Sequence, residues 1–548
     1  MAAGWGDRVL IFNKEWHTSD MYILGLKVRY MRPFYCAIFA LFLSSYAQVN
    51  GEELEVLWTQ YGVSDGVLKM SVHTDLNPME PVSRKAELWF EREGVWTKDS
   101  ESEIEALTAM AVFRIEAWDS RESVAYRVVC GASSREGIVR AEPVDKAALK
   151  LMAVACVKDT YYPYEKAVAQ MIAQDPDLLF FAGDQIYEKN ADGKVVKAKR
   201  AEDVPRAMAN YLKKWRLFGL TFRDLLKDRP SIMITDDHDV YSNDLWGRGG
   251  IRSPGERLDG GYLHPTWVNA VEKTQVWHLP DAANPGPWGD GIFAYYTSLN
   301  YAGVSFAILE DRKFKSAPNQ AFVMLEDGDS PWAKGKGKSK LSEVISNPDF
   351  DASKLNHPEF QLLGKDQEEF VAQWSDTVAK SNRMAVVLSQ SPYVNVGNYK
   401  PNYGDMDSNG WPQSARNRAL KAIVPSGAVM ISGDIHYGTL LQHGIKEWGD
   451  GPWSYSLPAF GSTANRIWKP SVSAQGGAIS GMEGSGNHHD RFGNKLTLAA
   501  KADGVVGYGI VLLDKEKKEL TFEIHPMDEK REPDPRPILG WPMTIRVE

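Results

Sequence analysis

The chain has 548 residues, of which 43% are hydrophobic and 25% are charged, so its composition is that of a globular protein and not of a disordered or fibrous one. Its 63 lysines and arginines and 72 aspartates and glutamates give a formal net charge of −9, which argues against nucleic-acid binding by phosphate neutralisation. Three cysteines are too few for a disulfide framework.

One N-terminal segment has the pattern of a secretory signal peptide. Residues 31–47 combine a basic start at Arg32, an apolar run over 34–43 and a small-residue end, which is typical of such signals. The run is shorter than the ~20 apolar residues of a spanning helix. We therefore expect no stable membrane span and a secreted or periplasmic protein, although a buried helix is the alternative interpretation.

The two ends of this signal define further expectations. No arginine pair precedes the apolar run, so the pattern indicates a Sec-like export route. Residues 1–30 have no role in this interpretation, and we expect them to be a non-native or mis-annotated extension, with translation starting at Met31.

Residues 52–145 contain short runs that alternate between apolar and polar side chains, such as 67–73 and 86–90. Charged residues and Gly, Asn or Pro turns separate these runs, which favours an antiparallel β-sandwich. The segment carries no cluster of chemically reactive residues. It is therefore predicted to be an accessory domain of the immunoglobulin or fibronectin type.

From residue 146 to 548 apolar runs alternate with helical stretches, which indicates an α/β core with a central sheet. Residues 507–514 and 519–525 are predicted to form a hairpin. Helices are expected over 164–174, 204–227 (broken at Gly219) and 367–380, and strands over 149–157, 177–183, 231–235, 304–309, 384–388 and 428–432. Three glycine-rich stretches, 242–261, 326–340 and 471–487, are expected to be lids or disordered loops.

Polar residues gather where four predicted strands end. Cys156 lies at the end of the first, and Asp184-Gln185-Ile186-Tyr187-Glu188, Asp236-Asp237-His238-Asp239 and Asp434-Ile435-His436 follow three others. In open α/β sheets, ligands bind beyond the carboxyl ends of the strands. Thiol, phenol, carboxylate and imidazole groups are metal ligands. The four stretches therefore predict one metal-binding site.

Each stretch also has a simpler interpretation. Cys156 could fill the core, and Asp184 to Tyr187 could be a helix cap with a packed aromatic ring. The acidic run around His238 is harder to explain without a cation, because its carboxylates would repel one another.

Taken in order, these motifs resemble the PhoD-like alkaline phosphatases within the calcineurin-like metallophosphoesterase superfamily. The resemblance covers about residues 145–525, and weaker similarities lie at 306–314, which includes Asp311 and Arg312, and at 490–494. An N-terminal β-sandwich ahead of the core also suits that family.

The resemblance implies a four-layer α/β/β/α metallophosphoesterase core that binds one Fe3+ ion and Ca2+ ions. Other divalent metals remain alternatives, because no twin-arginine signal points to metal loading before export. In this comparison His238 stabilises the transferring phosphoryl group or protonates the leaving oxygen. The implied metal ligands are Cys156 and Tyr187 for iron, Asp184 as a bridge between metals, and Asp237, Asn243, Asp434 and His436.

Two arginines after the acidic motif are weaker candidates for substrate binding. Arg248 and Arg252 could hold a phosphate by bidentate hydrogen bonds. Alternatively they are solvated charges of a loop.

These observations together predict a secreted, metal-dependent phosphoesterase that acts as a monomer on small phosphate mono- or diesters. A phospholipase-like phosphodiesterase or a sulfatase on the same metal fold is one alternative, because pocket shape alone would separate these substrates. A catalytically dead protein that binds a surface glycan is the other.

Overall fold

The computed structural model describes two strands near the N-terminus and residues 54–547, apart from 81–83, 254, 334–341, 398–402, 464–465, 471–479 and 481. Strands β1 (Ser19–Ile23) and β2 (Leu26–Tyr30) pair as an antiparallel hairpin within a first unit, residues 1–53, and residues 54–548 form the second unit. The predicted signal peptide at 31–47 lies outside the described residues. Among the residues described, no helix is both long and apolar enough to cross a membrane.

The second unit begins with two antiparallel sheets. The first has the strand order β3-β4-β7 and the second β6-β5-β8-β9. The alternating runs at 67–73 and 86–90 lie in β4 and β5, as their pattern predicts. The bounds are β3 (Val56–Ser64), β4 (Val67–Thr74), β5 (Lys85–Arg92), β6 (Val95–Glu103), β7 (Met110–Ile115), β8 (Val124–Cys130) and β9 (Ser133–Val139).

A six-stranded mixed sheet follows, with the order β12-β11-β10-β23-β24-β25. Its strands β10, β11 and β12 are parallel, so their carboxyl ends lie at the same edge. The other three strands pair antiparallel, and β23 and β24 form the predicted hairpin. The bounds are β10 (Ala148–Val154), β11 (Leu178–Phe181), β12 (Ser231–Met233), β23 (Val506–Asp514), β24 (Glu519–Met527) and β25 (Met543–Arg546).

An eight-stranded mixed sheet has the order β13-β14-β16-β18-β20-β19-β22-β21. Here β14, β16, β18 and β20 are parallel to one another, and a two-stranded pair, β15 (Val344–Ile345) with β17 (Gly404–Asp405), lies outside this sheet. The bounds are β13 (Thr297–Tyr301), β14 (Val304–Ile308), β16 (Met384–Ser389), β18 (Val429–Ser432), β19 (Gly438–His443), β20 (Trp453–Ser456), β21 (Gly486–His489) and β22 (Lys495–Ala502).

The two large sheets share one apolar core. Leu151 and Ala153 of β10 pack in the same cluster as Val386 of β16 and Ile431 of β18. The core thus contains two large sheets, whereas the apolar runs predicted a single central one. Periodicity identifies a strand but not its partners, because both faces of these strands are buried.

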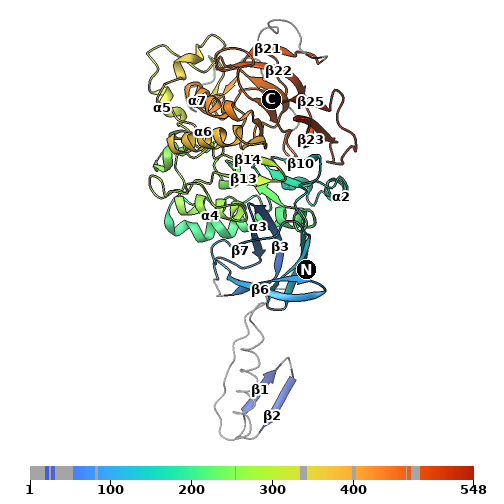
Figure 1. The fold of residues 1–548 in the computed structure, drawn as a ribbon. Coiled ribbons are helices and arrows are strands. Elements are labelled where there is room, and N and C mark those ends of the chain that lie inside the picture. Colours follow the sequence, from blue (N-terminus) through green and yellow to red (C-terminus); the bar gives the residue numbers. More distant parts are fainter. Residues whose placement is uncertain are drawn as a thin grey trace. The chain divides into compact units, whose positions relative to one another are not determined.

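The helices cover the other faces of these sheets. Val154 and Phe181 belong to a cluster with residues of α2 and α3, and Val387 and Met430 to a cluster with residues of α6 and α7. Figure 1 shows α6 and α7 next to each other on their sheet. The bounds are α2 (Glu165–Ala173), α3 (Val204–Leu226), α4 (Pro265–Val276), α5 (Pro318–Phe322), α6 (Lys365–Ala379) and α7 (Gln413–Ile423).

Helix α3 is continuous, so the predicted break at Gly219 is wrong. A Cβ atom at Gly219 would lie 2.3 Å from Cε2 of Trp58 on β3. The glycine therefore serves close packing between helix and strand, which a single-sequence pattern cannot distinguish from a helix end.

A buried histidine joins the N-terminal sheet to the six-stranded sheet. The Nδ1 atom of His278 lies 3.1 Å from Nε2 of Gln60 on β3, and its Nε2 atom lies 3.0 Å from the carbonyl oxygen of Ser231 on β12. Burial lowers the pKa of His278 to about 3. The neutral ring thus makes polar contacts with both sheets.

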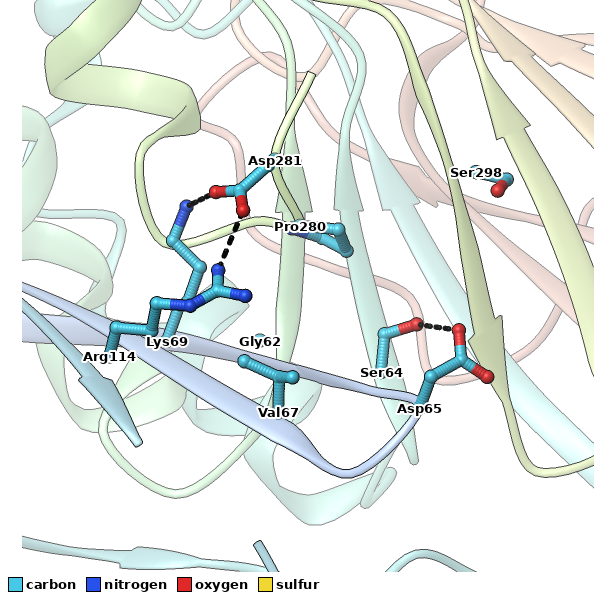
Figure 2. A pocket seen from close by; sticks show the side chains of 9 residues that line it. All are labelled: Gly62, Ser64, Asp65, Val67, Lys69, Arg114, Pro280, Asp281 and Ser298. Carbon is cyan, nitrogen blue, oxygen red and sulfur yellow. Dashed lines mark hydrogen bonds and ion pairs between the residues drawn. The ribbon is translucent and has the colours of Figure 1, made fainter. Parts of the chain in front are cut away.

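A cavity of about 150 Å³ opens beside this contact. Figure 2 shows Lys69 and Arg114 pointing to the carboxylate of Asp281, with ion pairs of 3.1 and 2.8 Å. The two cations are thus paired within the wall of the cavity.

Candidate metal centre

The candidate ligands follow strands of both large sheets. Cys156 comes two residues after β10 and Asp184 three residues after β11. Asp237 and His238 follow β12, and the latter begins the short 3-10 helix η3 (His238–Val240). Asp434 follows β18 of the other sheet. Parallel strand ends thus bring distant parts of the chain together.

The backbone at these ligands is unusual. Cys156, Asp184, Asp434 and His436 have φ values of 59°, 55°, 65° and 56°, a left-handed conformation that costs non-glycine residues on the order of 1–3 kcal/mol each. Such conformations cluster at functional sites because the surrounding structure holds them in place.

One glycine permits the close approach of two motifs. Gly183, with φ of 101°, precedes Asp184, and a Cβ atom there would lie 2.4 Å from the Cβ atom of Asp236. No other residue type fits this backbone beside Asp236 without displacement.

The side chains of the predicted motifs meet in overlapping groups. Within each group, every residue offers one ligand atom, and these atoms lie within 4.8 Å of one another. The groups are Cys156–Asp184–His436, Asp184–Asp237–His238, Asp236–Asp237–Asp434 and Asp237–Asp244–Asp407. Asp184 and Asp237 each belong to more than one group, which is what neighbouring metal ions that share ligands require.

The electrostatics of these carboxylates favour cations. Burial raises the pKa of Asp184 and Asp236 well above the usual range and that of Asp434 to about 7. Oδ2 of Asp236 and Oδ1 of Asp237 are buried without a hydrogen-bond partner. Because unpaired buried oxygens are costly, the donor set fits hard cations that would bind them.

The thiol and the phenol lie on one side of this cluster. The hydroxyl oxygen of Tyr187 is 3.0 Å from Nε2 of His436, and the thiol of Cys156 donates to the carbonyl oxygen of Asp434 at 3.6 Å. Cys156 and Cys130 are both free, so no disulfide prevents the thiolate from binding a metal. Burial raises the pKa of Cys156, and a bound cation would reverse this effect.

His238 is oriented by an acidic partner. Its Nδ1 atom lies 3.0 Å from Oε2 of Glu188, and its ring lies 4.4 Å from that of Tyr187. Burial favours the neutral imidazole, but the charges of Asp237, Asp184 and Glu188 outweigh it and raise the pKa of His238 well above its usual value.

Asp239 acts on the backbone of the motifs. Its Oδ2 atom accepts from the amides of Asp184 and Asp236, both at 2.9 Å, and its Oδ1 atom accepts from the amide of Ile186 at 3.2 Å. Asp239, the fourth residue of the acidic motif, thus links the segment that follows β11 to the segment that follows β12.

Two further residues join the site that the strand-end pattern did not single out. Asp244 and Asp407 lie near Asp237, and the amide of Asp244 donates to Oδ2 of Asp237 at 2.5 Å. Asp407 follows the two-residue strand β17, which is too short for a sequence pattern to indicate. Asp244 is the neighbour of the predicted ligand Asn243. The side chain of Asn243 is half-buried, and its role as a metal ligand remains a prediction.

The predicted phosphate clamp has other partners in this structure. Arg248 donates to the carbonyl oxygen of Asp259 at 3.4 Å, and Arg252 donates to that of Lys199 at 2.5 Å. The loop around them is packed, since Trp246 is fully buried. Their substrate-binding role remains a prediction, and the loops 326–340 and 471–487 lie partly outside the described residues.

Comparisons with known proteins identify the fold and the family of this chain. A search of curated proteins found no match. Among solved structures, one titled "Structure of PhoD" has a TM-score of 0.60 and 15% identity and covers 87% of each chain, which shows a common fold. Another, titled "GAP50 the anchor in the inner membrane complex of Plasmodium", has a TM-score of 0.30 and 10% identity and covers 74% of this chain and 90% of that one. The sequence profile of the PhoD-like phosphatases matches residues 151–472, over half of the sequence, so the chain belongs to the PhoD-like phosphatase family, whose members are hydrolases acting on phosphoric esters.

Proposed function

We propose that the protein is an exported phosphoesterase that hydrolyses small phosphate mono- or diesters at the metal centre described above. The observation that carries this proposal is the meeting of four distant motifs, drawn from both large sheets, in overlapping groups of three residues whose ligand atoms lie within 4.8 Å of one another inside each group. The packing of helices outside two facing sheets supports the four-layer α/β/β/α core of the family.

The ligand set suits two kinds of cation. Cys156 and Tyr187 would supply anionic ligands to Fe3+, and the carboxylates of Asp237 and Asp434 would hold Ca2+, with Asp184 between them. His436 and Asn243 would complete the set. When bound, such ions would neutralise the charge of the phosphate and supply an activated water as the nucleophile.

The chain's own contribution to catalysis centres on His238. Glu188 engages Nδ1 at 3.0 Å, which fixes the ring and leaves Nε2 as the nitrogen that can face a substrate. A protonated Nε2 would donate to the departing alkoxide or stabilise charge on the phosphoryl oxygens. The side chain is 20% exposed, so it borders both the carboxylates and the solvent from which an ester arrives.

The test compares metal content with activity on a panel of substrates. Purified protein should contain iron and calcium by elemental analysis and hydrolyse an aryl phosphate at alkaline pH. An aryl diester, a phospholipid and an aryl sulfate tested in parallel separate a monoesterase from a diesterase, a phospholipase-like enzyme and a sulfatase. Asp184→Ala should lose metal and activity together. Metal-replete protein that hydrolyses neither monoesters nor diesters would refute the proposal and favour a binding protein.

Export is tested independently of catalysis. The signal pattern at 31–47 predicts a mature chain that begins near Gln48. Mass spectrometry of the N-terminus of the native protein checks this, and a chain that retains Met1 would contradict it.

A further inference from the structure

The guanidinium of Arg312 lies among carboxylates from both large sheets. Arg312 follows β14, and its side chain is only 1% exposed. Its Nε atom donates to Oδ1 of Asp236 at 2.6 Å, its Nη2 atom lies 3.0 Å from Oδ2 of Asp434, and its Nη1 atom pairs with Asp407. Since Asp236 follows β12 and Asp434 follows β18, this one side chain links the two sheets at the candidate metal centre.

Arg312 engages one oxygen of each carboxylate and leaves another. Oδ1 of Asp236 accepts from Arg312 and from the amide of Asp237 at 2.8 Å, whereas Oδ2 is buried without a partner. For Asp434 the contact is also with a single oxygen, Oδ2, which accepts from the hydroxyl of Ser391 at 2.5 Å. The second oxygens of both carboxylates are thus the ones available to a cation.

The backbone of Arg312 is fixed as firmly as its side chain. Its amide donates to Oε1 of Glu310 at 2.8 Å, and its carbonyl oxygen accepts from the amide of Gly247 at 3.0 Å. Arginine presents its donors in a rigid planar fork, unlike the single flexible ammonium of lysine. The position therefore specifies the directions of the hydrogen bonds to Asp236 and Asp407 and not only a positive charge, whereas Asp434 is held by an ion pair with Nη2.

We propose that Arg312 is a positioning residue, which turns Asp236 and Asp434 so that their remaining oxygens face a bound cation. This inference rests on the proposed metal-dependent function. A fixed positive charge beside a cation site opposes cation binding by Coulomb repulsion. The benefit that we assign to Arg312 is therefore orientation of the carboxylates. Removing the positive charge should weaken cation binding if orientation dominates, and strengthen it if Coulomb repulsion dominates.

The experiment measures cation affinity in charge-preserving and charge-removing variants. After removal of metals by a chelator, Ca2+ and Mn2+ are titrated into wild type, Arg312→Lys and Arg312→Gln by calorimetry. Arg416→Lys is the matched control, because Arg416 is equally buried and donates to the carbonyl oxygens of Tyr393 and Gly444, both at 2.8 Å.

We expect Arg312→Lys to bind these cations about 10–100-fold more weakly, as outer partners of metal ligands commonly do on substitution. Arg312→Gln should also bind more weakly, and Arg416→Lys should match the wild type. If Arg312→Gln bound cations more tightly, charge alone would explain the residue and the inference would be overturned. The same holds if Arg312→Lys keeps wild-type affinity, or if Arg416→Lys loses as much.

The wild type separates this inference from the proposed function. Wild-type protein that binds no cation and cleaves no ester refutes the proposed function itself. Wild-type protein that does both, with unchanged affinity in the Arg312 variants, refutes only the role of Arg312. If circular dichroism shows that Arg312→Lys does not fold, Arg312→Gln decides the question, because weaker cation binding supports the inference and tighter binding overturns it.

Discussion

Replacing Gly183 by alanine should damage both stability and metal binding. The new Cβ atom would lie 2.4 Å from the Cβ atom of Asp236, at a φ of 101°. The left-handed backbone costs a residue with a Cβ atom about 1–2 kcal/mol. The overlap with Asp236 adds roughly 1–3 kcal/mol by overpacking. Together they predict a loss of about 2–5 kcal/mol in the free energy of unfolding.

Gly193→Ala is the matched control for this variant. Gly193 has a φ of 70°, but a Cβ atom there would meet nothing within 4 Å, so only the backbone cost of about 1–2 kcal/mol applies. Urea unfolding of both variants measures the difference, and calorimetric titration with Ca2+ measures metal affinity. Equal losses of stability, together with wild-type metal affinity in Gly183→Ala, would show that Gly183 does not set the approach of Asp236.

Three further results are expected. His238→Ala should lower kcat by about 10²–10⁴-fold, as for loss of a general acid, while elemental analysis finds its metals retained; an unchanged kcat would reject its role. If Tyr187 binds ferric iron, the protein should be coloured and Tyr187→Phe should bleach it, whereas a colourless active enzyme would point to other metals. The pKa of His278 is lowered to about 3 from the ordinary 6.5, so the unfolded chain binds more protons between these values, and stability falls as pH drops below 6.5. The unfolding temperature of His278→Gln should therefore decrease less than that of the wild type as the pH is lowered below 6.5. An equally steep decrease in the variant would contradict this role of His278.

The sequence predicted the strands and the polar residues that follow them because both signals are local. Apolar runs that end in Cys156, Asp184, Asp236 and Asp434 can be identified without knowing which strands pair. The number of sheets could not be predicted in this way, because β10 and β18 are both largely apolar although they belong to different sheets.

Other parts of the site depend on contacts between distant residues. The interactions of Arg312 with Asp236 and Asp407 span 76 and 95 positions, and no spacing rule connects them. Gly219 illustrates the same limit in a helix. A glycine is required there because the ring of Trp58, which is distant in the sequence, occupies the space of a Cβ atom.

The contact of Trp58 with α3 has a practical consequence for anyone who wishes to study the catalytic part in isolation. A truncated protein that starts at residue 146 would lack Trp58 and Gln60, and water would reach Gly219 on the helix and the imidazole of His278. Such a fragment would expose an apolar notch and tend to aggregate. Truncation is therefore better placed before residue 54, where the second unit begins.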